Sequence, residues 1–415
     1  MPYGTLGTDR VRTINYERMR DYRLNRTRQL MNDEGLDVMI TWEPWNIRYI
    51  ASAYVPMATR WGSQQFVVLC RNGDPHLFSY TCYNTEGLRE EMPWLKGNVW
   101  AAPEGGKLLT RTSQLDEFMG IVNKIIADHG LTGGRVGLDA CPNYYLYEAA
   151  FRKEGYTVVD PALMMFKARM IKNEDELACT RYACYAADAA FAAIQREIRP
   201  GVRECELQAV GMQALYELGA DETMDFVVAS GPRTCPLHID YTDRIVRPGD
   251  YVVIDINGNS FNGYKSCYYR TFICGSATQE QKDGYEVARK MMYDGLAQMR
   301  AGSTTDDVLD AWPSSPRFWG YDTDDTRYLG GHALAHGIGL SLHEYPMFGV
   351  GGPAGGRPPC VTFEEGMVIA IETIYGNRNT LHPYATRLEE CVAITKDGYE
   401  LLTKYPVGQI IECPL

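Results

Sequence analysis

The chain has little of what marks membrane, secreted or nucleic-acid-binding proteins. Its 415 residues contain no run of about eighteen uninterrupted apolar residues, and the N-terminal segment has no apolar signal-peptide core. Basic residues are fewer than acidic ones, 41 against 53, and the resulting net charge of -12 argues against a phosphate-backbone partner. We therefore expect a cytoplasmic protein with no membrane partner and no nucleic-acid partner.

The sequence also lacks CxxC motifs and internal repeats. The twelve cysteines are scattered from Cys70 to Cys413 without a CxxC pair or a disulfide-framework spacing, which suits a reducing compartment and mostly buried thiols. No repeat or low-complexity segment stands out. With 45% hydrophobic and 23% charged residues the composition is that of a globular protein, and 415 residues predict two domains.

The first 160 residues alternate helical and strand patterns. Residues 15–34 predict an amphipathic helix that ends at Gly35, and residues 115–129 predict another that ends at Gly130. Asn72-Gly73 lies between two apolar runs and predicts a β-hairpin, because Asn-Gly favours the positive-φ turn that joins such strands. Residues 1–160 are expected to form a small α/β domain.

The rest of the chain has a different pattern. Asn173 and Glu176 have the spacing of a capping box, so a long helix is predicted to begin there and to end before Pro200-Gly201. Strand-like runs then alternate with a few helices, notably over residues 279–300. The pattern predicts that residues 161–415 form an α+β domain with a mixed, largely antiparallel sheet.

Histidines cluster in one segment of this second domain. The sequence HALAHGIGLSLHEYP, residues 332–346, holds three of the chain's seven histidines, His332, His336 and His343. Histidine is the commonest metal ligand and moves protons near neutral pH. The cluster therefore indicates metal binding or catalysis if carboxylates accompany it.

Three carboxylates do interrupt apolar strand patterns. Asp255 and Glu372 each follow an apolar run, and Glu389 stands at the entrance to another. Each alone could face solvent at a strand end or pair with an arginine. Together with His336 they match the ligands of a hard or borderline divalent metal ion, because buried carboxylates need a cation between them.

The order of the motifs resembles that of the pita-bread superfamily of creatinases, prolidases and methionine or X-Pro aminopeptidases. The motifs are Asp255, GYKSCYYRTF at 263–272, HGIGLSLHE at 336–344, GMVIAIETIYG at 366–376 and RLEECVAIT at 387–395. Local similarity extends to the dimethylsulfoniopropionate lyase of the same fold. The resemblance implies a C-terminal pita-bread catalytic domain, a creatinase-type N-terminal domain and a homodimer.

The resemblance also implies a metal site, with one departure from the family pattern. The positions that correspond to the family's ligands are Asp255, Cys267, His336, Glu372 and Glu389. Cys267 replaces the second aspartate, and a thiolate is a softer ligand that favours one zinc or iron ion over manganese. The lyase pattern is also incomplete, because it has a further aspartate where this chain has Asn257. A metal-free enzyme like creatinase is the alternative.

Two other histidines fall on positions with a role in the superfamily. His238 falls where creatinase has its catalytic histidine. His343 lies seven residues after His336, as in the peptidases, where this residue stabilises the negative charge that develops on the substrate carbonyl. Both are expected to stabilise the reaction intermediate.

These residues predict a metal-assisted hydrolase that cleaves a C–N bond in an X-Pro-like dipeptide, a small amide or a guanidino compound. The ion would activate water, and Glu372 would carry the proton to the leaving nitrogen. Arg387 would orient Glu389 or bind a substrate carboxylate. A lyase that acts by proton abstraction is the second hypothesis; a metal-free amidinohydrolase and a non-catalytic binding module also remain open.

Two further segments bear on the substrate. Trp42, Trp45 and Trp61 could hold a cationic group between aromatic faces, although packing in the core or a dimer contact is the alternative interpretation. The sequence GGPAGGRPP at 351–359 predicts a flexible loop beside the pocket that could act as a lid.

Overall fold

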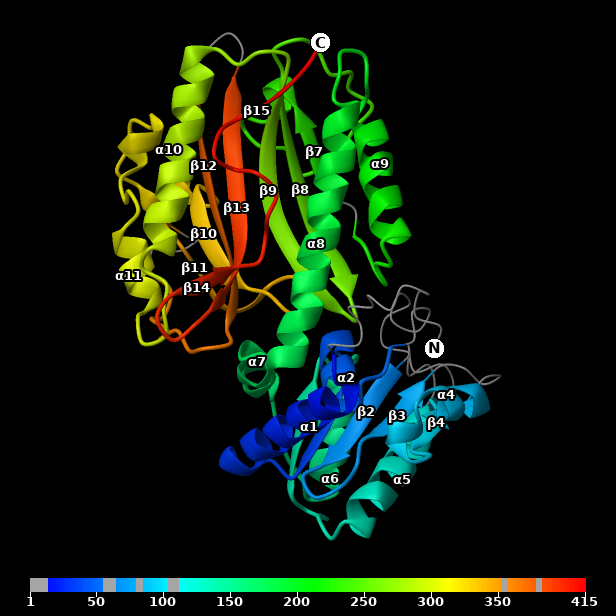
Figure 1. Ribbon diagram of the computed structural model, residues 1–415. Coiled ribbons are helices and arrows are strands. Elements are labelled where there is room, and N and C mark those ends of the chain that lie inside the picture. The colour runs from blue at the N-terminus through cyan, green and yellow to red at the C-terminus, as the bar shows by residue number, and fades with distance from the viewer. Residues whose placement is uncertain are drawn as a thin grey trace. The chain divides into compact units, whose positions relative to one another are not determined.

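Figure 1 shows the computed structural model, which describes residues 14–54, 65–79, 85–103, 112–224, 226–351, 357–377 and 383–415. It divides into two compact units, Asn15–Arg169 and a unit that contains Met170–Leu415. Within the described residues, no helix is both long enough and apolar enough to cross a membrane.

The first unit is built around a mixed six-stranded sheet. Its elements are α1 (Tyr16–Asp33), β1 (Val38–Thr41), α2 (Pro44–Ala51), β2 (Gln65–Cys70), β3 (His76–Ser79), α4 (Thr85–Glu91), η2 (Pro93–Leu95), β4 (Val99–Ala101), α5 (Thr112–Asp128), β5 (Arg135–Asp139), α6 (Tyr144–Lys153), β6 (Thr157–Val159) and α7 (Ala162–Met170), the last of which ends at the boundary. The strand order is β4-β3-β2-β1-β5-β6, and β1 pairs antiparallel with β2 and parallel with β5.

Local signals account for several of these elements. The side chain of Asn15 caps α1 by accepting a hydrogen bond from the backbone N–H of Arg18 at 3.0 Å. The Asn72-Gly73 turn joins β2 to β3, which pair antiparallel as a hairpin. Trp42 packs in the core of this unit, with ring centroids 5.3 Å from Phe66 and 5.2 Å from Tyr147. The small α/β domain is confirmed.

The second unit contains two sheets. Its elements are α8 (Glu174–Glu197), α9 (Glu204–Glu217), β7 (Val227–Ser230), η4 (Gly231–Arg233), β8 (Tyr251–Phe261), β9 (Tyr264–Cys274), α10 (Gln279–Leu296), α11 (Thr305–Asp310), η5 (Pro316–Trp319), η6 (Thr326–Leu329), β10 (Ala333–Gly337), β11 (Glu344–Gly349), β12 (Val368–Asn377), β13 (Tyr384–Ile394), β14 (Tyr399–Leu401) and β15 (Ile411–Cys413).

The sheets are largely antiparallel. One has the order β11-β10-β12-β13-β14 with every pair antiparallel, and the other has the order β15-β9-β8-β7, in which only β15 runs parallel to its neighbour. Helices α8 and α9 pack on the β7–β9 side, and α10 packs on β12 and β13 (Figure 1). The predicted α+β fold is therefore confirmed.

The long helix α8 begins where its sequence signal predicts. Asn173 accepts hydrogen bonds from the backbone N–H groups of Asp175 and Glu176, and the Glu176 carboxylate accepts one from the Asn173 backbone N–H at 2.8 Å. This reciprocal capping box satisfies N–H groups that the helix itself cannot pair. Helix α8 ends at Glu197, before Pro200.

Candidate active site

Strand register brings the candidate residues to one place. In the β12–β13 ladder Glu372 lies directly opposite Glu389. In the β10–β12 ladder Leu334 lies opposite Glu372, and His336 is two residues further along the same face of β10. In the other sheet Asn257 lies opposite Cys267, and β9 contacts β13. Residues far apart in the sequence therefore meet where the two sheets adjoin.

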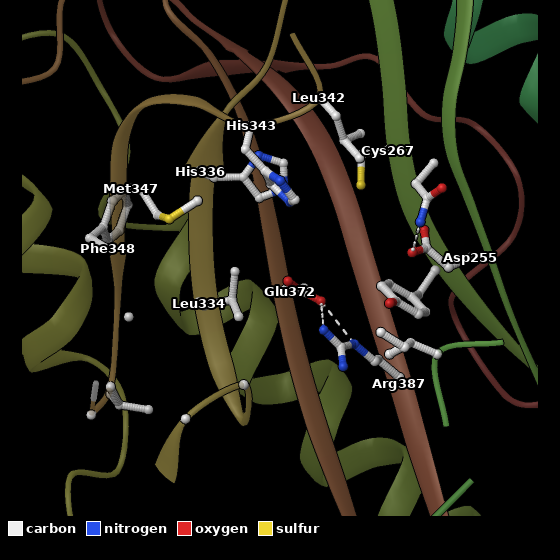
Figure 2. A pocket seen from close by; sticks show the side chains of 18 of the residues that line it. Asp255, Cys267, Leu334, His336, Leu342, His343, Met347, Phe348, Glu372 and Arg387 are labelled. Carbon is white, nitrogen blue, oxygen red and sulfur yellow. Dashed lines mark hydrogen bonds and ion pairs between the residues drawn. The ribbon is translucent and has the colours of Figure 1, made fainter. Parts of the chain in front are cut away.

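A pocket of about 800 Å³ opens at this position. Its walls are mainly apolar and include Val227, Ile239, Leu334, Leu342, Met347, Phe348 and Val350. The polar side chains that line it include Asp255, Asn257, Cys267, Tyr269, His336, His343, Glu372 and Arg387 (Figure 2). A mostly apolar cavity with a few convergent polar groups is typical of a small-molecule site.

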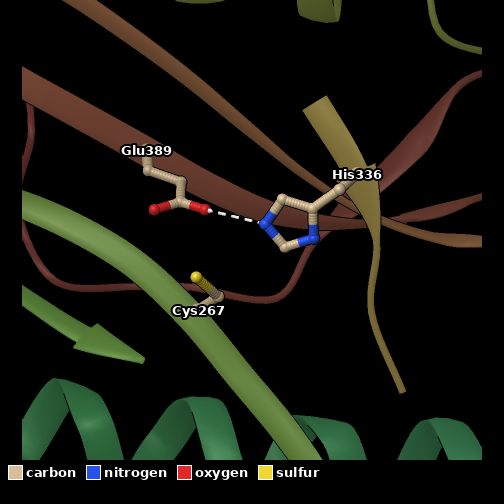
Figure 3. Close-up of side chains that lie close together, drawn as sticks. All are labelled: Cys267, His336 and Glu389. Atoms are coloured by element: carbon tan, nitrogen blue, oxygen red, sulfur yellow. Dashed lines mark ion pairs between the residues drawn. The ribbon is translucent and has the colours of Figure 1, made fainter. Parts of the chain in front are cut away.

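Three buried residues form a candidate metal centre. One ligand atom each from Cys267, His336 and Glu389 lie within 4.8 Å of one another, and Figure 3 shows the three side chains converging. The Nε2 atom of His336 is 3.8 Å from Oε1 of Glu389. Two ligands of one tetrahedral ion lie roughly 3.4 Å apart when each bond is about 2.1 Å long, so the spacing needs little adjustment.

Local hydrogen bonding orients the Nε2 atom of His336 toward this centre. Its Nδ1 atom lies 2.9 Å from the carbonyl oxygen of Gly337, which can only accept, so Nδ1 carries the proton and the lone pair of Nε2 faces Glu389. A side chain at position 337 would place a Cβ 2.6 Å from the Tyr345 carbonyl oxygen, so the close approach of β11 requires glycine. Burial lowers the pKa of His336 to about 3, which keeps the ring neutral and able to ligate.

The other two donors also fit a cation. Among the described residues, no nitrogen or oxygen donor reaches either carboxylate oxygen of Glu389, and the Cys267 thiol is its hydrogen-bonding neighbour. Burial, together with the nearby Glu372 and Asp255, raises the pKa of Glu389, and burial likewise raises the pKa of the Cys267 thiol. A bound divalent ion would supply the positive charge that the carboxylate and thiolate lack, and would favour their ionised forms.

Glu372 and Arg387 are paired with each other. Nε of Arg387 donates to Oε2 of Glu372 at 2.8 Å, and Nη2 donates to the same oxygen. The Arg387 guanidinium also lies 4.3 Å from the centroid of the Tyr269 ring. Arg387 thus pairs with Glu372, whereas the sequence predicts Glu389 or a substrate carboxylate as its partner.

Asp255 lies on β8 beside Asn257. Its Oδ2 atom accepts a hydrogen bond from Nδ2 of Asn257 at 2.8 Å, since residues two apart on a strand share a face. Burial, and the charge of Glu372, raise the pKa of Asp255 to about 7. Neither Asp255 nor Glu372 belongs to the Cys267–His336–Glu389 cluster of the described residues, although both line the same pocket.

The two other candidate histidines lie in different settings. His343 lines the pocket, and its ring centroid is 4.5 Å from that of His336. Partial burial lowers the pKa of His343, so the ring is neutral at neutral pH and can donate one hydrogen bond. His238 is exposed and is not among the described residues that line the pocket, whereas its neighbour Ile239 is.

The loop that carries His238 is held by a residue that sequence reasoning missed. The buried Glu204 carboxylate accepts hydrogen bonds from the backbone N–H and hydroxyl of Ser230 and from those of Thr242. Nothing in the sequence distinguishes this glutamate from any other in a helix's first turn. Tyr269 was also missed, although its place two residues after Cys267 on β9 could have put it on the same face.

Two predicted features lie partly outside the described residues. Trp61 and residues 352–356 of the 351–359 loop are outside them. Gly351, Arg357 and Pro358 from the same loop line the pocket. Trp42 is a core residue of the first unit, in line with the packing interpretation.

Comparisons with known proteins agree with this architecture. Residues 23–171 match the creatinase/prolidase N-terminal domain. The prolidase structure from Thermococcus sibiricus superposes with a TM-score of 0.76 at 20% identity, covering 96% of this chain and 99% of that one, which shows a shared fold.

Curated relatives have two kinds of named activity. The Xaa-Pro dipeptidase of Pyrococcus furiosus is 31% identical over 57% of this chain, and the matched region spans 64% of that protein, which is less than two thirds of its length. The dimethylsulfoniopropionate lyase of Roseovarius nubinhibens is 24% identical over 98% of this chain and 90% of the lyase.

The family match that covers most of the chain lies in the second unit. Metallopeptidase family M24 matches residues 178–396, which is more than half of the 415-residue chain and contains strands β7 to β13, which line the pocket. The family description names metal-dependent peptidases, in agreement with the buried Cys267–His336–Glu389 cluster. The chain belongs to metallopeptidase family M24.

Proposed function

We propose that the chain is a metal-assisted hydrolase that cleaves a C–N bond, with an X-Pro-like dipeptide as its preferred substrate. The observation that carries the proposal is the buried Cys267–His336–Glu389 cluster beside the pocket-lining carboxylate of Glu372. Membership of family M24 and the likeness to a Xaa-Pro dipeptidase support it.

The proposed metal centre holds one ion, ligated by Cys267, His336 and Glu389. A bound divalent ion supplies a Lewis acid that polarises a carbonyl and lowers the pKa of water. Because one ligand is a thiolate, zinc or iron should bind more tightly than manganese.

Glu372 is the proposed proton carrier. Both hydrogen bonds from Arg387 end on Oε2, so Oε1 lies outside the ion pair and can accept a proton from water. The same oxygen can then deliver the proton to the leaving nitrogen. His343 donates a hydrogen bond to the carbonyl oxygen as negative charge develops on it.

The apolar residues that line the pocket favour a substrate with an apolar group. Leu334, Met347 and Phe348 offer a surface for a proline ring or an aliphatic side chain. An X-Pro-like dipeptide matches this surface better than a guanidino compound, which would place a cation against it. Small amides and guanidino compounds belong in the same substrate screen.

Metal content tests the ligand assignment. Cys267→Ser should lose bound zinc in elemental analysis, whereas Cys274→Ser on the same strand should keep it, because residue 274 points to the opposite face of β9. The cobalt-loaded protein should show a thiolate-to-metal absorption band that Cys267→Ser lacks. Equal zinc content in the two variants would reject Cys267 as a ligand.

Product analysis tests the reaction. The zinc- or iron-loaded protein should release free proline from Xaa-Pro dipeptides, and Glu372→Gln should lower kcat by about 10²–10⁴. Glu365→Gln, which changes an exposed glutamate on the same chain segment, is the matched control and should keep full activity. Release of no amine from any dipeptide or amide in the screen would contradict the proposal.

The lyase is the second candidate, because the chain resembles a dimethylsulfoniopropionate lyase over nearly its whole length. An unsaturated acid formed from dimethylsulfoniopropionate would favour it, and addition of water across a C–N bond would exclude it as the main activity. The proposal includes a homodimer, as the family resemblance implies, and sedimentation of the purified protein tests that assembly.

A further inference from the structure

A second cavity, of about 750 Å³, lies in the unit that contains Met170–Leu415. Tyr375 lines it, and because Tyr375 comes three residues after Glu372 on β12, the two side chains point to opposite faces of the strand. On the Tyr375 face, the Thr373 hydroxyl donates a hydrogen bond to the Ala288 carbonyl of α10 at 2.7 Å. Among the described residues, none that lines this cavity also lines the candidate active site, so the two cavities are separate.

Three aromatic side chains line this cavity, Phe318, Tyr375 and Tyr384. The ring centroids of Phe318 and Tyr375 are 5.4 Å apart, and 41% of Phe318 is exposed to solvent. Tyr384 stacks on the buried Tyr251 with 5.1 Å between centroids and 7° between ring planes. Gly284 on α10 keeps the space beside both tyrosines open, because even a Cβ there would lie 3.8 Å from Cδ1 of Tyr375 and Cε2 of Tyr384. Accessible aromatic faces held in this way attract cations.

Two carboxylates of α10 line the same cavity. The Glu280 carboxylate accepts hydrogen bonds from Nδ2 of Asn377 at 3.0 Å and from the Tyr384 hydroxyl, and both lower the pKa of Glu280, so it is ionised at neutral pH. Oδ1 of Asp283 accepts a hydrogen bond from Nε2 of Gln279 at 2.8 Å. Neither carboxylate is paired with a lysine or arginine in the part of the chain that the structure describes. The hydrogen bonds therefore orient the two carboxylates without neutralising them.

The basic side chain at this cavity is already matched by acidic ones. Among the described lining residues it is Arg317, whose Nε donates to Oδ1 of Asp324 at 2.9 Å and whose Nη1 donates to Oδ1 of Asp322 at 3.0 Å. The cavity therefore combines aromatic rings with the uncompensated negative charge of Glu280 and Asp283.

A guanidinium group suits these neighbours better than an ammonium group does. Its planar face stacks on aromatic rings while its N–H edge donates to carboxylates, whereas an ammonium group has no flat face to stack. Residues three apart on a helix have Cβ atoms about 5–6 Å apart, so one guanidinium can reach both Glu280 and Asp283.

We propose that this cavity is a second binding site, for a small molecule that carries a guanidinium group on a short apolar chain. The guanidinium donates to Glu280 and Asp283, and the apolar chain lies against Val287 and Phe318. The cavity volume falls within the range of small-molecule sites, roughly 300–1,000 Å³. The site does not depend on the proposed metal centre, so the failure of either proposal leaves the other intact.

Binding of n-butylguanidinium to the full chain tests the site. Isothermal titration calorimetry is used at low ionic strength, because salt screens exposed charges. The neutral isostere n-butylurea should bind at least about tenfold more weakly, since it lacks the charge that the carboxylates attract. Glu280→Gln, at an exposed position, and Gly284→Leu should each weaken n-butylguanidinium binding by a similar factor, the first by removing charge and the second by filling the cavity.

Two control variants locate the binding. Glu286→Gln removes an exposed carboxylate of the same helix that pairs with Arg289 and is not among the described residues that line the cavity, so it should bind like the wild type. Glu372→Gln changes the candidate active site and should also keep the wild-type affinity.

Each contrary result overturns the proposed site. Equal affinity for the two probes would exclude recognition of the cation, and unchanged affinity in both Glu280→Gln and Gly284→Leu would exclude this cavity. Weaker binding in Glu372→Gln alone would assign the cation to the candidate active site. No binding at millimolar n-butylguanidinium, by calorimetry or by ligand-observed NMR, would reject the proposal outright.

Discussion

Asp139 is a buried carboxylate in the first unit, far in sequence from the candidate active site. Its Oδ2 atom accepts hydrogen bonds from the Thr41 hydroxyl at 2.5 Å and from Nδ2 of Asn46 at 2.6 Å. Burial outweighs these hydrogen bonds and the charge of Arg169, so the pKa of Asp139 is raised. The native state therefore holds a proton that the unfolded chain releases at lower pH.

This shift predicts a pH dependence of stability. Between the unfolded pKa of about 3.9 and the raised native pKa, the native state binds more protons than the unfolded state, so the free energy of unfolding falls as pH rises. Asp139→Asn should remove that part of the slope in urea titrations at several pH values. Asp128→Asn, at an exposed position, is the control and should keep the wild-type slope. Equal slopes in Asp139→Asn and wild type would contradict the assignment.

Glu344, next to His343, forms a buried ion pair with Lys172. The Lys172 Nζ atom lies 3.1 Å from Oε2 of Glu344, and the two side chains are 1% and 0% exposed. The pair joins the segment that leads into α8 to the start of β11. The carboxylate also accepts the Ser341 backbone N–H at 3.1 Å, so it shapes the turn that presents His343.

Loss of the Lys172–Glu344 ion pair should lower the free energy of unfolding considerably. Lys172→Met leaves a buried carboxylate without its cation and should lower the free energy of unfolding by about 3–5 kcal/mol in urea titrations. Lys282→Met removes an exposed lysine that pairs with Glu412 and should cost about 1 kcal/mol or less. The double variant Lys172→Met with Glu344→Leu should recover much of the loss, and no recovery would indicate that packing rather than charge is responsible.

Among the elements, α8 depends on its capping box. Asn173→Ala removes the acceptor for the backbone N–H groups of Asp175 and Glu176, and should lower the free energy of unfolding by about 1 kcal/mol. Asn173→Ser retains a side-chain acceptor and should lose less. Identical unfolding midpoints for the alanine and serine variants would mean that the cap contributes little to this helix.

Element boundaries were the part of the fold most open to prediction from the sequence. The capping box at Asn173 and the Asn72-Gly73 turn are local signals, because the residues that interact are close in the chain. The apolar strands of the second unit were recognisable for the same reason. A strand's own pattern shows which residues share a face, which is why Asp255 and Asn257 lie side by side.

Contacts between residues on different strands could not be predicted from local sequence signals. The register that sets Ile374 opposite Arg387 also brings Arg387 diagonally to Glu372, and nothing in either strand alone fixes that register. The approach of Cys267 to His336 depends on how two separate sheets adjoin. Loop conformation decides that His238 is exposed while Ile239 lines the pocket.

For the whole molecule, metal binding should stabilise only the unit that contains Met170–Leu415, since the three proposed ligands all belong to it. Zinc at a hundred times its Kd should add about 2.7 kcal/mol to that unit's free energy of unfolding. In differential scanning calorimetry the corresponding transition should move to higher temperature, while the transition of Asn15–Arg169 stays in place. Cys267→Ser should show no such shift, and equal shifts of both transitions would contradict a site confined to one unit.

The three proposed ligands lie on three strands, Cys267 on β9, His336 on β10 and Glu389 on β13, so a bound ion would join the two sheets. Without a bound ion, packing and backbone hydrogen bonds alone would hold the strands together at this point, and they should separate more often. With an ion bound, the amide protons of these three strands should exchange with deuterium more slowly. Ion release and the local separation of the sheets would then be a single event.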